Sequence, residues 1–176
     1  MQINVSQLLK SDIGSIRGFE VSGVVDITGG GAGSVVSGAV RLMRTDRGIL
    51  VAGTINTQAE VICSRCLVTF SCPLALNFEE EYFPVLDVVS GIPVAVPGEP
   101  GSFTIDEHHV LDLTEAVRQY ALLVIPMKPL CREDCSGLCP ECGQNLNQGL
   151  CHCPPQPVDP RWAVLTKLSN KRKGSG

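Results

Sequence analysis

The sequence lacks the features of membrane-spanning and secreted chains. No apolar run among its 176 residues approaches the roughly 18 residues that a membrane helix needs. Met1–Lys10 contains no continuous apolar stretch either, so we expect no secretory signal peptide and a cytoplasmic protein. The net charge of −4 argues against a globally basic nucleic-acid binder.

Positive charge is missing from the middle of the chain. Between Arg65 and Arg118 there is no Lys or Arg, whereas nine acidic residues lie there, including those at 79–81. Basic residues gather instead in two clusters: Arg41, Arg44 and Arg47, and near the C-terminal end Arg161, Lys167, Lys171, Arg172 and Lys173. This asymmetry favours a partner bound at one end of the molecule, although solvated charges are also ordinary on exposed faces.

Cysteine, by contrast, is abundant. Eight of the nine cysteines form short-range pairs: Cys63 with Cys66, Cys131 with Cys135, Cys139 with Cys142, and Cys151 with Cys153. A tetrahedral zinc site takes four thiolate or imidazole ligands, and a tight turn that carries two sulfurs supplies half of such a site. The four pairs therefore predict two structural zinc ions. Gly143 suits the sharp turn expected after the third pair.

Two other chemistries are open to paired cysteines. Disulfides would leave one of the nine cysteines over, and a cytosolic chain keeps its thiols reduced. A redox dithiol of the thioredoxin kind belongs at a strand-to-helix turn, whereas C-S-R-C (63–66) interrupts a long alternating strand pattern. Zinc is the favoured interpretation. His152 is an alternative ligand, because imidazole also binds zinc.

The cysteine pairs predict two ligand sets. We expect Cys63, Cys66, Cys131 and Cys135 to share one zinc, which would tie the strand region to the segment after the predicted helix. The remaining set, Cys139, Cys142, Cys151 and Cys153, would hold the second ion. Spacing does not fix which pairs combine, so an exchange of pairs between the two sites stays open.

Alternating apolar and polar residues predict an α+β fold with a curled antiparallel sheet from about Phe19 to Phe83. The long alternation over 58–83 needs a bend or hairpin near C-S-R-C, and Pro73 predicts a bulge or a sheet edge. Cys72 follows the apolar face of this segment and is expected in the core. A further short strand is expected near Phe103–Ile105.

A helix over residues 112–125 is predicted to cover one face of the sheet. Its apolar positions, Leu113, Val117, Tyr120 and Val124, recur with helical spacing. Asp112 and Glu115 match a capping box, and Pro126 ends the helix.

The chain divides into an α+β core of residues 1–130 and a cysteine-rich segment of residues 131–176 packed on that core. The stretch from 131 to 153 has little apolar content, so metal is needed to hold it. Asp159 and Pro160 then predict the start of a last helix that carries Trp162, Leu165 and Leu168, followed by a basic tail.

Several motifs follow one another in a distinctive order. They are I-N-V-S-Q-L-L-K (3–10), C-S-R-C-L (63–67), F-E-E-E-Y-F-P (78–84), L-D-L-T-E-A-V-R-Q-Y-A-L-L-V-I-P (111–126), C-R-E-D-C-S-G-L-C-P-E-C-G-Q-N-L-N (131–147), a C-x-C pair (151–153) and D-P-R-W-A-V-L-T-K-L (159–168). This ordered set resembles the YceD family of large ribosomal RNA subunit accumulation proteins. The resemblance implies a role in the accumulation of large-subunit (23S) ribosomal RNA in bacteria and plastids.

The sequence contains no catalytic constellation. His108 and His109 precede the helix without a Ser-His-Asp arrangement, and eight thiolates argue for closed rather than catalytic zinc sites. We therefore expect a non-enzymatic, zinc-stabilised ribosome-biogenesis factor. Its expected partners are the large-subunit RNA precursor or ribosomal proteins, with no membrane and no small-molecule substrate. The alternatives are a redox- or zinc-responsive regulator that uses C-S-R-C, and a protein adaptor that uses the acidic residues 79–81.

The residues expected to contact RNA or a partner are Arg65 and the two basic clusters. Arg65 lies between the two cysteines of the first pair. In that position it could instead bond backbone carbonyls or thiolates around the zinc.

Overall fold

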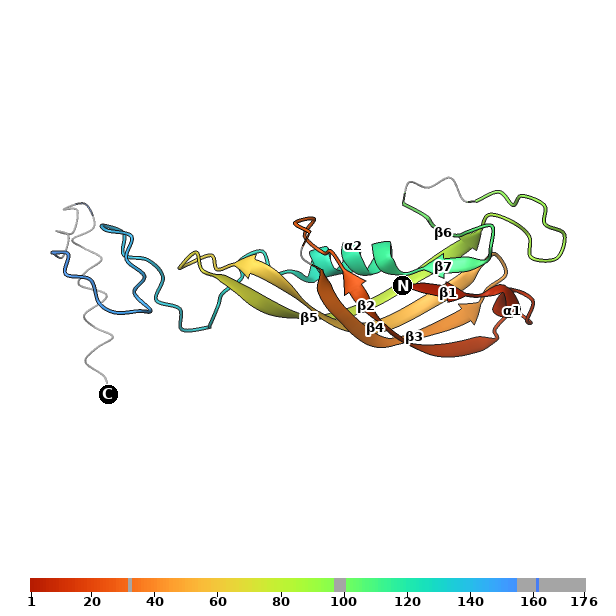
Figure 1. Ribbon diagram of the computed structural model, residues 1–176, viewed down its shortest axis with the longest axis horizontal. Coiled ribbons are helices and arrows are strands. Elements are labelled where there is room, and N and C mark those ends of the chain that lie inside the picture. Colours follow the sequence, from red (N-terminus) through yellow and green to blue (C-terminus); the bar gives the residue numbers. More distant parts are fainter. Residues whose placement is uncertain (32, 97–100, 155–160, 162–176) are drawn as a thin grey trace.

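The computed structural model describes residues 1–31, 33–96, 101–154 and 161. Within these residues, seven strands form one curled sheet and two helices accompany it (Figure 1). The strands are β1 (Gln2–Asn4), β2 (Ile16–Val25), β3 (Ser34–Arg44), β4 (Ile49–Ile62), β5 (Thr69–Pro84), β6 (Phe103–Ile105) and β7 (Val110–Asp112). The helices are α1 (Ser6–Leu9) and α2 (Thr114–Val124). The α+β prediction is confirmed.

The sheet has the strand order β1-β7-β6-β5-β4-β3-β2. Strands β2 to β5 form an antiparallel meander, and β4 and β5 pair without interruption from Ile49↔Tyr82 to Ile62↔Thr69. The turn at C-S-R-C joins these two long strands, so the predicted hairpin is confirmed. The antiparallel sheet expected from about Phe19 to Phe83 is confirmed, and the short strand expected near Phe103–Ile105 joins it by pairing in parallel with β5. The long connection between them allows the chain to return in the same direction.

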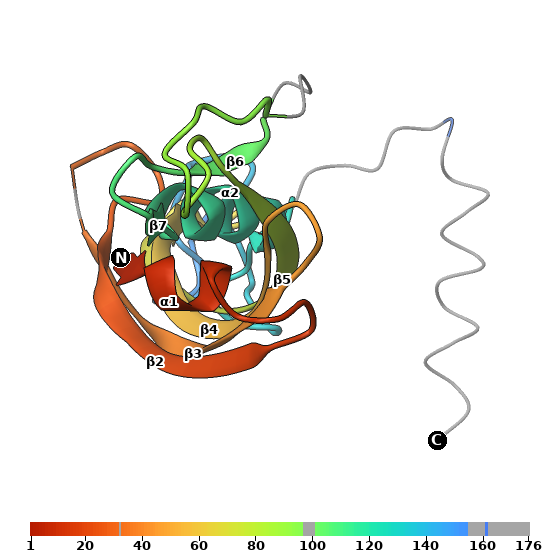
Figure 2. The same cartoon turned by 90° about the vertical axis from the view of Figure 1, so that its right-hand side faces the viewer.

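The strands curl around α2, as the end-on view shows (Figure 2). Strand residues on the inner side, such as Val36, Leu42, Ile55 and Leu76, are completely buried. Each buried side chain of this size contributes about 1.5–3 kcal/mol. This burial holds the sheet and the helix together as one core.

Helix α2 buries Ala116, Val117 and Ala121 against the sheet. The Tyr120 hydroxyl donates to Glu80 Oε1 over 2.7 Å, and its ring lies 5.3 Å from that of Phe78. Val124 was expected in this interface but is 40% exposed, because the helix ends there and the chain leaves the sheet.

The expected capping box is not formed. Asp112 Oδ1 does accept the Thr114 N–H over 2.8 Å, but the residue at the N-cap position is Leu113. Glu115 instead binds the Arg118 guanidinium through both carboxylate oxygens, over 2.8 and 2.9 Å. This bidentate ion pair draws the Glu115 carboxylate away from the helix start.

Pro73 lies at an open sheet edge. It pairs with Gln58 in the unbroken β4–β5 register, so the expected bulge is absent. Strand β5 has a second partner only at Tyr82–Pro84 among the described residues, which leaves the edge near Pro73 unpaired. Cys72 is half-buried and packs against the core.

None of the helices in the described ranges has the length and apolar character that crossing a bilayer requires.

Candidate metal centres

The turn between β4 and β5 carries the first pair of thiols. The Cys63 N–H donates to Val68 O over 2.9 Å, and the Leu67 N–H donates back to Cys63 O over 3.0 Å. Leu67 has a positive φ of 59°, which closes the turn tightly. The turn therefore places Cys63 and Cys66 on the same side.

The segment after α2 brings the second pair to this turn. The Ser64 N–H donates to Pro129 O over 2.8 Å, which fixes the returning chain beside the hairpin tip. Cys131 and Cys135 follow, with a turn closed by the Cys135 N–H and Arg132 O at 3.2 Å. Residues separated by 72 positions in the sequence thus meet.

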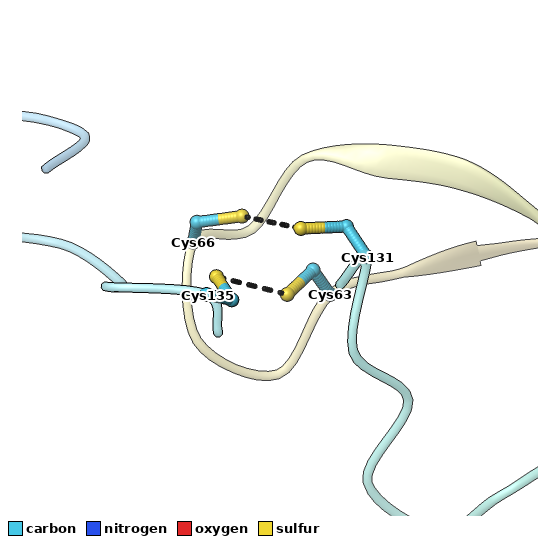
Figure 3. A group of neighbouring side chains, drawn as sticks. All are labelled: Cys63, Cys66, Cys131 and Cys135. Carbon is cyan, nitrogen blue, oxygen red and sulfur yellow. Dashed lines mark hydrogen bonds between the residues drawn. The ribbon is translucent and has the colours of Figure 1, made fainter. Parts of the chain in front are cut away.

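These four thiols, called the first cysteine cluster below, have the geometry of a tetrahedral metal site (Figure 3). Cys63 Sγ lies 3.8 Å from Cys135 Sγ, and Cys66 Sγ lies 3.6 Å from Cys131 Sγ. All four sulfurs lie within 4.8 Å of one another. Zinc–sulfur bonds of about 2.3 Å at tetrahedral angles require sulfur separations of about 3.8 Å. Since a disulfide has a sulfur separation of about 2.05 Å, these distances fit shared metal ligation.

The second cysteine cluster consists of Cys139, Cys142, Cys151 and Cys153. Their sulfurs also lie within 4.8 Å of one another, and the Cys139 and Cys151 sulfurs are 3.4 Å apart. The Cys139 N–H donates to Gln144 O over 2.8 Å and the Gly143 N–H donates to Cys139 O over 2.9 Å. The structure therefore groups the cysteines into the two predicted sets. His152 is not among the grouped ligands in the described part of the chain.

The two clusters differ in burial. Cys63, Cys66 and Cys135 are almost completely buried and Cys131 is half-buried. In the second cluster Cys139 is buried, Cys151 and Cys153 are half-buried, and Cys142 is exposed. An ion in the first cluster would be closed off from solvent, whereas one in the second would lie near the surface.

Arg65 supports the first cysteine cluster from within the turn. Its Nη1 donates to the backbone carbonyl of Cys135 over 2.9 Å. Gly137 backs onto the same turn, since a Cβ there would lie 3.2 Å from Arg65 O. The structure thus shows Arg65 bonded to the backbone of a cluster residue, which was one of its two expected roles.

Asn147 is a supporting residue that no pattern in the sequence singled out. Its Nδ2 donates to Cys135 Sγ over 3.4 Å and to Asn145 Oδ1 over 2.8 Å, while its Oδ1 accepts the Ser136 N–H over 2.8 Å. An amide side chain after a cysteine pair is the only signal that could have found it. Asn147 links the loop after the second cluster's first pair to a sulfur of the first cluster.

Hydrogen bonds lower the pKa of Cys63 and Cys135 in the first cluster and of Cys139 in the second, and so favour their thiolate forms. Burial alone raises the pKa of Cys63, but hydrogen bonds from the backbone of Cys131, Cys66 and Arg65 outweigh it and lower the pKa to about 6. Hydrogen bonds from the backbone of Cys142 and Glu141 lower the pKa of Cys139 to about 7. The thiolate is the form that binds metal, so each cluster holds at least one cysteine that is favoured as a metal ligand.

The predicted basic contact residues that the structure describes have different surroundings. Arg41 is exposed on the outer face of β3. Arg44 Nη1 donates to Gly48 O over 2.8 Å. Arg47 pairs with Glu81 over 3.2 Å and lies over the Phe83 ring. Arg161 is exposed, and Lys167, Lys171, Arg172 and Lys173 lie outside the described residues, as does most of the predicted last helix.

The adjacent histidines are not brought to either cluster. His108 is exposed. His109 has a positive φ of 60°, and its carbonyl accepts the Val5 N–H over 2.9 Å. Both residues lie in the β6–β7 turn, and their carbonyls accept hydrogen bonds from Asn4 and Val5 at the end of β1.

The family described as "Large ribosomal RNA subunit accumulation protein YceD" matches residues 51–169 of the chain. The uncharacterized protein Rv2926c of Mycobacterium tuberculosis (strain ATCC 25618 / H37Rv) is 32% identical over 138 residues, which are 77% of this chain and 63% of that protein. The uncharacterized protein ML1660 of Mycobacterium leprae (strain TN) is 28% identical over 137 residues, 77% of this chain and 60% of that protein. The chain thus spans less than two thirds of the length of these relatives. No solved structure matches it.

Proposed function

Because the chain belongs to the YceD family, we propose that it promotes the accumulation of large-subunit (23S) ribosomal RNA in bacteria by binding, without catalytic turnover. The observation that supports this most directly is the family match over residues 51–169, which includes all eight clustered cysteines. The proposed setting is the cytoplasm, where subunits assemble and thiols stay reduced.

We propose that both cysteine clusters hold structural zinc. Four soft thiolates in a tetrahedral arrangement suit zinc. Such a site has no open position for a substrate, which distinguishes it from a catalytic zinc. The first ion would fasten the β4–β5 hairpin to the segment after α2, and the second would shape residues 139–153.

The two ions suggest a division of the chain. We propose a core of residues 1–130 and a zinc-stabilised segment of residues 131–176, joined through Cys63 and Cys66. Residues 131–153 of this segment have little apolar content, so metal binding would supply the free energy that their side chains cannot.

RNA or ribosomal-protein contact is proposed first for an exposed arginine of β3 and for the basic C-terminal end of the chain. Arg41 is exposed, and the C-terminal end of the chain carries Arg161, Lys167, Lys171, Arg172 and Lys173. Arg65, Arg44 and Arg47 are weaker candidates, because each makes a contact inside the protein.

The experiment that tests this proposal is ultraviolet crosslinking in cells, followed by sequencing of the bound RNA and mass spectrometry of the bound protein. Crosslinks to 23S precursor RNA or to large-subunit proteins are expected.

In parallel, a variant with Lys167, Lys171, Arg172 and Lys173 changed to Glu should co-sediment less with precursor subunits and keep its zinc. Each lost phosphate contact should also reduce the salt slope by about 0.7–0.9. Normal co-sedimentation of this variant at several salt concentrations, with no RNA crosslink, would contradict direct RNA binding.

The adaptor alternative is weakened by the contacts of the acidic residues. Glu80 accepts the Tyr120 hydroxyl, and Glu81 accepts Thr45 Oγ1 over 2.7 Å and pairs with Arg47. Of the three, Glu79 is the one that is exposed, whereas Glu80 and Glu81 are half-buried. The regulator alternative keeps one supporting observation, which is the exposure of Cys142 in the second cluster.

A further inference from the structure

Two unpaired strand edges face the same cavity. Strands β1 and β2 are the outermost strands of the sheet, and the curl visible in Figure 2 brings the two ends of the sheet round toward each other. A cavity of about 430 Å³ lies between them, lined by residues 1–4 and 19–22. A Cβ on Gly23 would lie 3.0 Å from Met1 Cγ, so the Met1 side chain lies against β2 at one end of the cavity. This cavity is called the β1–β2 slot below.

The edges of the slot offer backbone hydrogen-bonding groups. In the described residues β2 pairs only with β3 and β1 pairs only with β7. In an antiparallel ladder about every second residue directs its N–H and C=O away from the partner strand. Both β1 and β2 therefore present such groups toward the slot. A strand inserted there could pair on both of its sides, whereas a strand added to an ordinary sheet edge pairs on one.

The side chains lining the slot alternate between the two faces of the sheet. Ile3 and Val21 are buried toward the core and Phe19 is half-buried. Gln2, Asn4, Glu20 and Ser22 are exposed on the other face. Among the lining residues, Glu20 carries the single charged side chain. An inserted strand would therefore turn apolar side chains inward, and a basic residue on its outer face would pair with Glu20.

We propose that the β1–β2 slot binds an extended segment of a partner protein, with alternating apolar and basic residues, by β-strand addition. The inserted segment would lie about 4.7–4.9 Å from β1 on one side and from β2 on the other, the usual separation of neighbouring strands. A second folded copy is disfavoured as the occupant. Its β2 would already be paired with its own β3, and that β3 would collide with β1 of the first copy. The three residues of β1 would pair over about 10 Å. Beyond them, the partner segment would pair with β2 alone. The inference goes beyond the proposed role in RNA accumulation and does not depend on it.

The test uses the full-length zinc-loaded protein, labelled with ¹⁵N, and three synthetic peptides. The first peptide is four repeats of Lys-Val, the second is the same peptide with alternate amides N-methylated, and the third is four repeats of Glu-Val. We expect the first peptide to shift the amide resonances of residues 2–4 and 16–25. N-methylation removes backbone donors, so it should weaken binding at least about tenfold, since each hydrogen bond contributes about a factor of five. The Glu-Val peptide should bind more weakly than the Lys-Val peptide.

A charge variant and a matched control locate the site. Glu20→Lys should weaken binding of the Lys-Val peptide by about two- to fivefold, as expected for a cross-strand charge pair. Glu60→Lys makes the same change on an exposed residue of β4 outside the slot and should leave the affinity unchanged. The proposal is overturned by the absence of any shift at millimolar peptide or by shifts at the open β5 edge near Pro73 instead. It is equally overturned by concentration-dependent shifts of β2 without peptide, which would indicate a second copy, or by an RNA oligonucleotide that shifts the same residues equally.

Discussion

Arg65 is the residue at which structural support and RNA contact can be separated. Arg65→Ala removes the hydrogen bond from Nη1 to Cys135 O. We expect the affinity of the first cysteine cluster for zinc to fall by about tenfold, the lower end of the range for groups that orient metal ligands. The measurement is competition with a chromogenic zinc chelator, with the zinc released from each cysteine cluster followed separately.

Two further variants test whether the loss of zinc affinity in Arg65→Ala is specific to the Arg65 guanidinium. Arg65→Lys should recover part of the affinity at most, because an ammonium group lacks the planar fork of the guanidinium. Arg41→Ala removes an exposed arginine far along the sheet and should leave zinc binding unchanged. Unaltered zinc affinity in Arg65→Ala together with lost co-sedimentation would reverse our assignment and make Arg65 an RNA contact.

Asp112 gives the fold a pH dependence that can be measured. Burial raises its pKa, but hydrogen bonds from the Thr114 hydroxyl and N–H, the N-terminal amino group and Gln2 outweigh burial and lower it from 3.8 to about 2. The folded protein therefore binds this proton more weakly than the unfolded chain. Its stabilising contribution is complete above about pH 4 and is lost as the pH falls toward 2.

Asp112→Asn should therefore lower the free energy of unfolding at pH 7 by about 1 kcal/mol, a value reduced for solvent screening. The difference from the unsubstituted protein should shrink toward zero near pH 2. Urea unfolding at pH 7, 4 and 2 measures both. Glu60→Gln serves as the control for loss of an exposed carboxylate, and a difference that persisted unchanged at pH 2 would rule out the proton linkage.

At the scale of elements, the curl of the sheet depends on close contact between β3 and β4. A Cβ on Gly38 would collide with the Thr54 carbonyl oxygen and lie 2.8 Å from Ile55 Cα. Backbone atoms cannot rotate aside, so Gly38→Ala should lower the free energy of unfolding by about 1–3 kcal/mol. Gly18→Ala on β2 is the matched control, because nothing lies within 4 Å of its Cβ position. Equal urea midpoints for the two variants would show that the strands can separate without cost.

How far the sequence predicts these elements depends on the range of the interaction that forms them. Alternation marked β5, and helical spacing marked α2, because both patterns are local. The parallel pairing of β6 with β5 and the pairing of β1 with β7 left no such pattern, because they join segments distant in the chain. The capping box failed for a different reason: the Glu115–Arg118 ion pair is itself local, three residues apart, and it took the carboxylate that the capping motif needed.

The candidate metal centres were more predictable than the groups that support them. Pair spacing identified all eight clustered cysteines, because two sulfurs on a tight turn are a local feature. The contact of Asn147 with Cys135 and that of Arg65 with the same residue depend on the packing of one loop against another. Neither side chain has a spacing that reveals its partner.

At the scale of the whole molecule, removal of metal should separate the two proposed parts. Chelation should abolish amide-exchange protection over residues 131–153, because that segment has little core of its own. Protection in β2 to β5 should remain, since those strands bury an apolar core. Hydrogen exchange with mass spectrometry makes the comparison. Collective loss of protection in sheet and segment would contradict a boundary at residues 130 and 131.

Metal analysis of single-cysteine variants assigns the ions. Cys66→Ser should leave the second ion in place and Cys142→Ser the first, so each variant should retain one of the two zinc ions expected from eight thiolates. Cys72→Ser is the matched control, because Cys72 lies in neither cluster and this variant should retain both. Two ions in either cluster variant would show that three thiolates suffice there.

The pairing of β1 with β7 also sets an order of events during synthesis. Gln2 and Asp112, which this pairing joins, are 110 positions apart. At about 5–20 residues per second, β1 emerges from the ribosome several seconds before its partner strand exists. The meander of β2 to β5 is complete by then, so β1 must wait as an unpaired strand. Closure of so distant a contact is intrinsically slow. The pairing of β1 with β7 is therefore the late step that completes the sheet.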